Sequence, residues 1–215
     1  MLDEIARLLE LDLNTLDGIA VAGGPGSFTG LRIGAATAKG LGLALKKPLI
    51  HVPTVDAMAY NMWGASGLIC PIMDAKRSQV YTGLYHLEKG LEVIMKQCPM
   101  DMRELAAMLN ERGEKVIFLG DGVPVYKEII RNEMKAPYTF APAQMNRQRA
   151  SCVAALAMET LAAWKEGREK TGYQGAFVVD AGDFAPDYLR KSQAERQREA
   201  ELSPEGAAAK LPGDY

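Results

Sequence analysis

Residues 23–30, with the sequence GGPGSFTG, bring glycines, a proline and two hydroxyl side chains into one short segment. A glycine-rich turn between a strand and a helix can direct backbone N–H groups at the phosphate of a ligand. The Walker pattern needs a Gly-Lys-Ser/Thr ending, which is missing here, and Gly24, Gly26 and Gly30 do not have dinucleotide-binding spacing. The glycine pattern alone is weak support for phosphate binding, so an ATPase that uses this turn stays open as an alternative.

Ser27 and Thr29 are the candidate nucleophiles of this segment. A hydroxyl nucleophile needs a general base, and His51 and His86 are the two histidines of the chain. His51 lies in the apolar run PLIHV and His86 in a predicted hairpin strand, where a histidine is more often structural. The segment also lacks the G-x-S-x-G spacing of a hydrolase elbow. A peptidase-like hydrolase that uses residues 23–30 is therefore kept only as an alternative.

Small residues recur at every fourth position after this turn, at Gly30, Gly34, Ala38 and Gly42. They form one line along a helix, which we call the small-residue stripe. Because each glycine inside a helix costs about 1 kcal/mol relative to alanine, the stripe needs a reason, and close approach of another backbone is the usual one. That backbone belongs either to the sheet of the same domain or to a second helix.

The composition of the 215-residue chain is that of a globular protein, with 48% hydrophobic residues and a formal net charge of −2. This charge argues against a whole-surface attraction to nucleic acid, although it is compatible with a local basic stripe. No apolar run reaches the roughly 20 residues of a membrane span, and the acidic amphipathic N-terminus does not predict a signal peptide. The histidines and the scattered Cys70, Cys98 and Cys152 predict no metal site and no cofactor, and such cysteines are typical of a cytoplasmic protein.

Strands and helices alternate along the first half of the chain, which predicts an α/β fold with a parallel sheet. Strands are expected at 18–24 and 48–52, and the helix between them is expected to run from Ser27 to Lys46. A hairpin follows, with its turn at 75–78. We expect an incomplete first domain at 1–98, a smaller α/β domain at 99–183 and a polar, disordered C-terminal segment at 184–215.

Three segments in chain order resemble the TsaB (YeaZ) family. The most specific is AVAGGPGSFTGLRIGAATAKGLGLALKKPLIHVPTVDAMA, at residues 20–59. PIMDAKRSQVYTGLY, at 71–85, is similar to the Asp-Ala-Arg hairpin of that family, and APDYLRKSQAE, at 185–195, to its Tyr-Leu-Arg segment. The resemblance covers residues 2–195. Members of the family begin with a strand hairpin that carries an AIDTS-like motif, whereas this sequence starts within the helix that follows, so the first domain is expected to lack those strands.

The resemblance implies an actin-like ATPase fold of the ASKHA, ribonuclease H-like class. It also implies a non-catalytic accessory subunit that binds and activates TsaD, which transfers the threonylcarbamoyl group to tRNA adenosine next to the anticodon. TsaD and TsaE would be protein partners, a second copy of the chain could pair as a homodimer, and tRNA would be contacted indirectly. The implied interface is formed by the turn and the helix after it, namely Gly26, Ser27, Phe28, Thr29, Gly30, Leu31, Arg32, Gly34, Ala38 and Gly42.

Two smaller polar groups remain. Asp74, Lys76 and Arg77 at the hairpin tip could contact tRNA phosphate or a partner, although a solvated turn is the simpler interpretation. Arg147 and Arg149 form a small basic patch before a helix and are also interpreted as a solvated surface.

Overall fold

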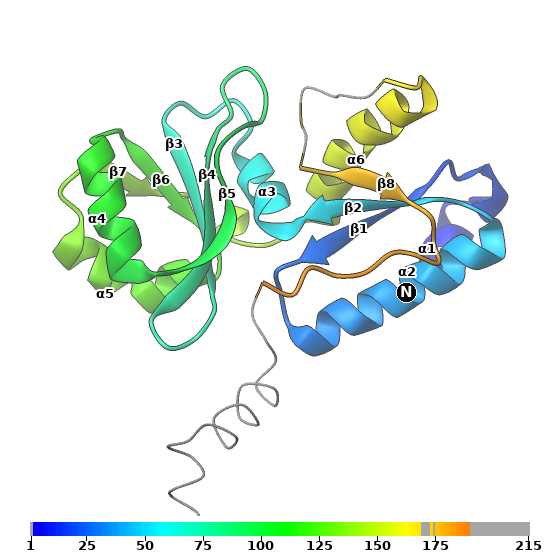
Figure 1. Cartoon of the computed structure of the whole chain (residues 1–215), viewed down its shortest axis with the longest axis horizontal. Helices are drawn as coiled ribbons and strands as arrows, with labels where there is room; N and C mark the ends of the chain where they lie inside the picture. The colour runs from blue at the N-terminus through cyan, green and yellow to red at the C-terminus, as the bar shows by residue number, and fades with distance from the viewer. Residues whose placement is uncertain (1, 169–172, 174, 190–215) are drawn as a thin grey trace, which may run out of the picture.

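The computed structural model describes residues 2–168, 173 and 175–189 of the chain, and it shows two lobes on either side of a short helix (Figure 1). The first lobe contains a three-stranded sheet and the second a five-stranded sheet. The predicted disorder of the C-terminal segment from residue 190 onward lies outside the described residues. Among the described residues, no helix is long and apolar enough to cross a membrane.

The first lobe is built on a sheet whose strand order is β1-β2-β8. β1 (Ile19–Gly24) and β2 (Leu49–Pro53) are parallel, which confirms the predicted parallel pair, and β8 (Phe177–Val179) is antiparallel to β2. Helices cover both faces of this sheet, so every residue of β2 is buried. The helices of this lobe are α1 (Leu2–Leu8), α2 (Phe28–Leu45) and α6 (Ala150–Lys165).

The second lobe has the strand order β5-β4-β3-β6-β7. In this sheet β3, β4 and β5 form an antiparallel meander, whereas β6 and β7 run parallel to β3. The bounds are β3 (Leu68–Asp74), β4 (Gln79–His86), β5 (Glu92–Asp101), β6 (Val116–Leu119) and β7 (Tyr138–Phe140).

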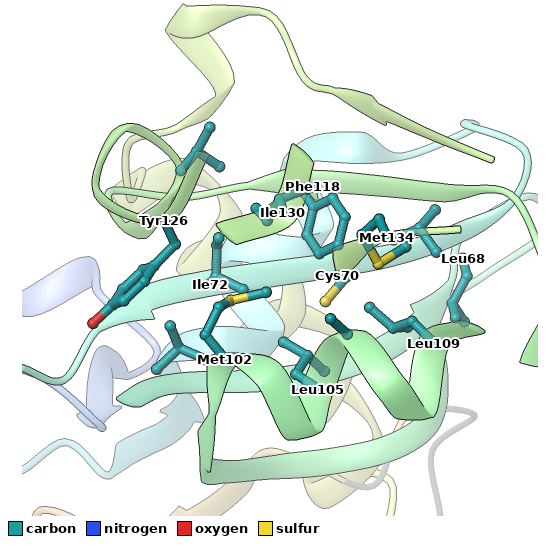
Figure 2. Packing of buried hydrophobic residues seen from close by; sticks show 14 of the residues in the cluster. Leu68, Cys70, Ile72, Met102, Leu105, Leu109, Phe118, Tyr126, Ile130 and Met134 are labelled. Carbon is teal, nitrogen blue, oxygen red and sulfur yellow. The ribbon is translucent and has the colours of Figure 1, made fainter. Parts of the chain in front are cut away.

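Two helices, α4 (Met102–Arg112) and α5 (Gly122–Glu133), close one face of the five-stranded sheet. Figure 2 shows Met102, Leu105 and Leu109 of α4 pointing at the sheet side chains Cys70 and Phe118. Burial of this apolar surface is the main source of stability for the lobe.

The helix between the lobes is α3 (Thr54–Ala59), and all of its residues are buried. Its Val55 and Met58 pack into the core of the second lobe, whereas Ala57 packs against α6 in the first.

One structural feature corrects the expected domain organisation. The boundary was placed near Cys98 and Pro99, but both residues lie inside β5. The chain instead leaves the first lobe at α3, completes the whole five-stranded sheet and returns to the first lobe as α6 and β8. A proline inside an edge strand needs no ladder donor there, and this explains why Pro99 does not end the strand.

Candidate partner-binding helix and the cleft beside it

The glycine-rich turn after β1 is held by close contacts within the chain. The Gly24 N–H donates to Thr54 Oγ1 at 3.1 Å, and the Gly24 carbonyl accepts from Gln97 Nε2 at 3.0 Å. Gly24 has a φ of +119°, and a Cβ there would lie 2.5 Å from the Asp187 carbonyl oxygen. A side chain at this position is therefore excluded both by the backbone conformation and by space. Packing accounts for this glycine without a bound phosphate.

His51 occupies the space beside the neighbouring glycine, because a Cβ on Gly23 would lie 1.9 Å from His51 Nε2. The imidazole is 1% exposed and stacks on Phe177 at a centroid distance of 4.6 Å. Its Nε2 faces Asp187 Oδ2 at 3.3 Å, and neither ring nitrogen makes a hydrogen bond to a residue that the structure describes. Burial lowers the pKa of His51 below its ordinary value, and the Asp187 carboxylate offsets part of that effect. This histidine packs as the sequence predicted.

Ser27 is the N-cap of α2, since its Oγ accepts from the Gly30 N–H at 3.4 Å. The other histidine, His86, faces Glu114 Oε2 at 3.1 Å from its Nε2. Within the described part of the chain, no hydrogen bond joins Ser27 or Thr29 to a histidine. The turn therefore has the geometry of a helix start rather than of an activated nucleophile.

The small-residue stripe is divided into two halves that have different surroundings. Ala38 and Gly42 are buried, and a Cβ on Gly42 would lie 2.7 Å from the Ala181 Cβ and 3.0 Å from Leu49 Cδ2. Among the residues that the structure describes, a Cβ on Gly34 would meet nothing within 4 Å, and one on Gly30 would meet only the Ser27 side chain. The expectation that the whole stripe faces a partner is therefore corrected for Ala38 and Gly42, which pack inside the chain. For Gly30 and Gly34 it stays a prediction.

The exposed residues of α2 carry one charged group, the guanidinium of Arg32. This guanidinium lies over the Phe28 ring at 5.3 Å, and the Phe28 ring lies 5.1 Å from that of Tyr188. Surfaces that bind proteins are depleted in charge and enriched in arginine and aromatic side chains. We call this surface the open face of α2, and it comprises Phe28, Thr29, Gly30, Arg32, Ile33, Gly34, Ala36, Thr37, Gly40, Leu43 and Ala44.

A cleft of about 630 Å³ lies between the lobes beside the start of α2. Its walls include Ser27 and Gly34 from the first lobe and Asp121 and Asn146 from the second. Arg147 is the one basic side chain among the described residues that line it. The ATPase alternative would have to place its phosphates here, and a single exposed arginine gives that interpretation little support.

The polar hairpin tip is partly committed to contacts inside the chain. Asp74 Oδ1 accepts from Tyr126 Oη at 2.9 Å and from the Lys76 N–H at 2.9 Å. Burial raises the pKa of Asp74, but hydrogen bonds from Lys76 and Tyr126 outweigh it, so the pKa lies below its ordinary value. Burial and the Asp74 carboxylate raise the pKa of Tyr126 to about 12. Of the three predicted contact residues, Arg77 is the exposed cation that makes no ion pair within the described chain.

The remaining candidate residues are also accounted for. Arg149 donates to the Gln144 carbonyl at 2.8 Å and starts α6, whereas Arg147 borders the cleft. Asp121 Oδ1 accepts from the Asp74 N–H at 3.3 Å. Among the described residues, no group of three histidine, cysteine or carboxylate side chains is arranged to hold a metal ion.

Sequence reasoning missed a buried polar group at the junction of the lobes. Asp56 Oδ1 accepts from Tyr85 Oη at 2.6 Å, and Asp56 Oδ2 accepts from Tyr173 Oη at 2.6 Å. Nothing in the spacing of Asp56, Tyr85 and Tyr173 along the sequence indicates that they meet.

Known proteins resemble this chain along most of its length. A family model described as TsaD, tRNA N6-adenosine threonylcarbamoyltransferase, matches residues 1–198. The tRNA threonylcarbamoyladenosine biosynthesis protein TsaB of Bacillus subtilis is 35% identical over 181 residues, which covers 84% of this chain and 72% of that protein. The protein of the same name from Haemophilus influenzae is 28% identical over 197 residues, covering 79% of this chain and 82% of that protein.

Solved structures give the same result. A Pseudomonas aeruginosa protein described as similar to peptidase YEAZ is 25% identical, with a TM-score of 0.66, over 88% of this chain and 81% of that one. This likeness and the mixed α/β architecture with two sheets confirm the expected actin-like ATPase fold.

Proposed function

Because the chain belongs to the TsaB (YeaZ) family, we propose that it is an accessory subunit that binds a TsaD-type transferase through the open face of α2. Its relatives are named for tRNA threonylcarbamoyladenosine biosynthesis, and the chain takes part in that biosynthesis. In this proposal TsaD carries out the transfer to tRNA adenosine, TsaE joins the two proteins, and tRNA meets this chain only through the assembly.

The observation that carries the proposal is that the exposed surface of α2 has a single charged residue, Arg32. A helix on the surface of a globular protein ordinarily has charged and polar residues opposite its buried side. On α2 the exposed Ile33 (63%) and Leu43 (61%) are accompanied by alanine, glycine and threonine. Because the glycines leave the backbone accessible, a second helix can approach closely there, and the flanking apolar side chains supply buried area.

The family relationship supports a TsaD-type partner. The family model that matches this chain is that of the transferase itself, so the two proteins share a fold. Chains of one fold can pair through the same helix on each partner, in a nearly two-fold arrangement. The same geometry permits a second copy of this chain, and that homodimer is the competing assembly.

We also propose that the chain does not itself catalyse the transfer. This part of the proposal is supported by the role of Ser27 as a helix cap and by the described hydrogen bonds, none of which joins Ser27 to His51 or His86. The purified chain is expected to show no ATP hydrolysis above background. Robust hydrolysis that disappears in Gly26→Val or Ser27→Ala would establish the ATPase alternative instead.

The functional test is the N6-threonylcarbamoyladenosine content of tRNA in cells that lack the gene. Wild-type chain should restore the modified nucleoside, and Gly34→Leu should fail to do so at equal protein level. Ala107→Leu is the matched control, because it adds the same side chain at an exposed position of α4 in the second lobe. Equal restoration by both variants would remove the open face of α2 from the proposal, and no effect of the gene itself on the nucleoside would remove the proposed pathway.

A further inference from the structure

A second property of the molecule concerns how the two lobes are held together. We propose that Asp56 and Tyr85 form a lock that fixes the angle between the lobes and so sets the width of the cleft between them. The lock lies at the start of α3, where the chain passes from one lobe to the other.

The Asp56 carboxylate is bonded on both sides by phenols from different parts of the molecule. Tyr85 comes from β4 in the second lobe, and Tyr173 precedes β8 in the first. Asp56, Tyr85 and Tyr173 are 4%, 0% and 3% exposed. Asp56 lies in the first turn of α3, which continues directly from β2 of the first lobe. The Tyr85 bond therefore crosses between the lobes, whereas the Tyr173 bond stays within the first lobe.

The surrounding backbone makes room for both phenols. A Cβ on Gly83 would lie 2.3 Å from Tyr85 Oη, and a Cβ on Gly175 would lie 2.1 Å from Tyr173 Oη. Larger residues at either position would displace the hydroxyl from the carboxylate. The backbone at Gly83 and Gly175 therefore provides the space that the Tyr85 and Tyr173 hydroxyls need to reach Asp56.

A second polar link crosses between the lobes one residue earlier in the chain. Gln97 of β5 accepts from the Val55 N–H at 3.2 Å and donates to the Gly24 carbonyl at 3.0 Å. One side chain of the second lobe thus holds both the first turn of α3 and the glycine-rich turn. Together with the Tyr85 bond, these hydrogen bonds fix the orientation of the lobes relative to each other, which apolar packing alone does not do.

Energetics favour a conformational role for the carboxylate. Burial raises the pKa of Asp56 even though Tyr173 and Tyr85 donate to it, so keeping it ionised opposes folding. A buried carboxyl group that does not add stability is best explained by the single arrangement that its hydrogen bonds specify. Here that arrangement joins the lobes at α3, whose Thr54 and Met58 line the cleft.

The lock is tested by two substitutions that each remove one phenol hydroxyl from the same carboxylate. Tyr85→Phe breaks the bond between lobes, and Tyr173→Phe breaks the bond within one lobe. Nitroxide labels at Glu111→Cys on α4 and Ala162→Cys on α6 report the distance between lobes by double electron–electron resonance. Cys98 and Cys152 are replaced by serine in all proteins, and Cys70 is fully buried.

We expect both variants to lower Tm by about 2–4 °C, because each leaves the carboxylate with one donor fewer. Only Tyr85→Phe should broaden the distance distribution, and Gln97→Met should broaden it in the same way. An unchanged distribution in Tyr85→Phe and Gln97→Met would overturn the proposal, as would equal broadening in Tyr173→Phe. Binding to TsaD is not part of this readout, so the lock stands or fails independently of the proposed function.

Discussion

Helices α4 and α2 each cover one side of a sheet, but their outer surfaces differ. α4 buries Met102, Leu105 and Leu109, and it exposes charged residues, Arg103 and Glu111 among them. α2 buries only Ala35, Ala38 and Gly42 along its length, and its exposed residues carry one charge. α4 therefore has the ordinary amphipathic pattern of a surface helix, and α2 does not.

This difference indicates that the two helices serve different purposes. The large side chains of α4 contribute to the core of the second lobe, which they fill together with α5 (Figure 2). The buried residues of α2 are all small, whereas its large side chains Ile33 and Leu43 are exposed. Such a helix contributes less to folding than its apolar content suggests, and its outer surface remains available to a partner.

The largest expected contrast is between a leucine of α4 and a leucine of α2. Leu105→Ala should lower the free energy of unfolding by about 2–5 kcal/mol, because Leu105 is fully buried and its removal leaves a cavity. Leu43→Ala should change it by less than about 0.5 kcal/mol, since that side chain is 61% exposed. Urea unfolding of both variants measures the contrast. Similar losses in the two would mean that α2 is part of a core after all.

A smaller contrast is expected within the stripe. Gly42→Leu should destabilise the fold by about 1–3 kcal/mol, because the added side chain would meet Ala181 and Leu49. Gly34→Leu should leave stability unchanged or raise it by up to about 1 kcal/mol, because the space is open and leucine favours a helix more than glycine does. Thermal unfolding curves decide this point, and a Gly34→Leu loss equal to that of Gly42→Leu would contradict the division of the stripe.

The smallest expected effect is a pH dependence that arises at His51. Its folded-state pKa lies below the ordinary 6.5, so the unfolded state binds the proton more readily. The free energy of unfolding should therefore fall as the pH decreases through 6.5 toward the folded-state pKa. His51→Phe should remove that part of the pH slope, because the ring can still stack on Phe177 but cannot titrate.

Asp187→Asn provides a second test of the pH dependence that arises at His51. The Asp187 carboxylate partly restores the His51 pKa, so its loss should extend the acid-induced decrease to lower pH. If His51→Phe and the wild type have the same slope below pH 6.5, the histidine does not contribute to the pH dependence.

Local signals predicted much of the first lobe. Ser27 as a helix cap and the end of α2 near Lys46, which adopts a left-handed conformation, follow from capping chemistry. The parallel pair of strands follows from the alternation of strands and helices. The resemblance to TsaB predicted the actin-like ATPase fold, whereas the spacing of residues alone predicted only an α/β fold with a parallel sheet.

Three results could not be predicted because they depend on contacts distant in sequence. Spacing by four aligned Gly30 with Gly42, but it could not show that the helix turns Gly42 toward Ala181 and leaves Gly30 open. The predicted domain boundary near Pro99 does not match the structure for the same reason, because β5 continues through Pro99 as an edge strand. The bonds from Tyr85 and Tyr173 to Asp56 join residues 29 and 117 positions apart, and no local pattern signals such a meeting.

Isothermal titration of the purified chain with TsaD tests most directly whether the open face of α2 binds a TsaD-type partner. Three proteins are compared, the wild type, Gly34→Leu and Ala107→Leu, each first shown to be folded by its unfolding curve. We predict that Gly34→Leu weakens binding at least about tenfold, the equivalent of about 1.4 kcal/mol, while Ala107→Leu binds as the wild type does. Wild-type affinity in a folded Gly34→Leu protein would contradict the claim.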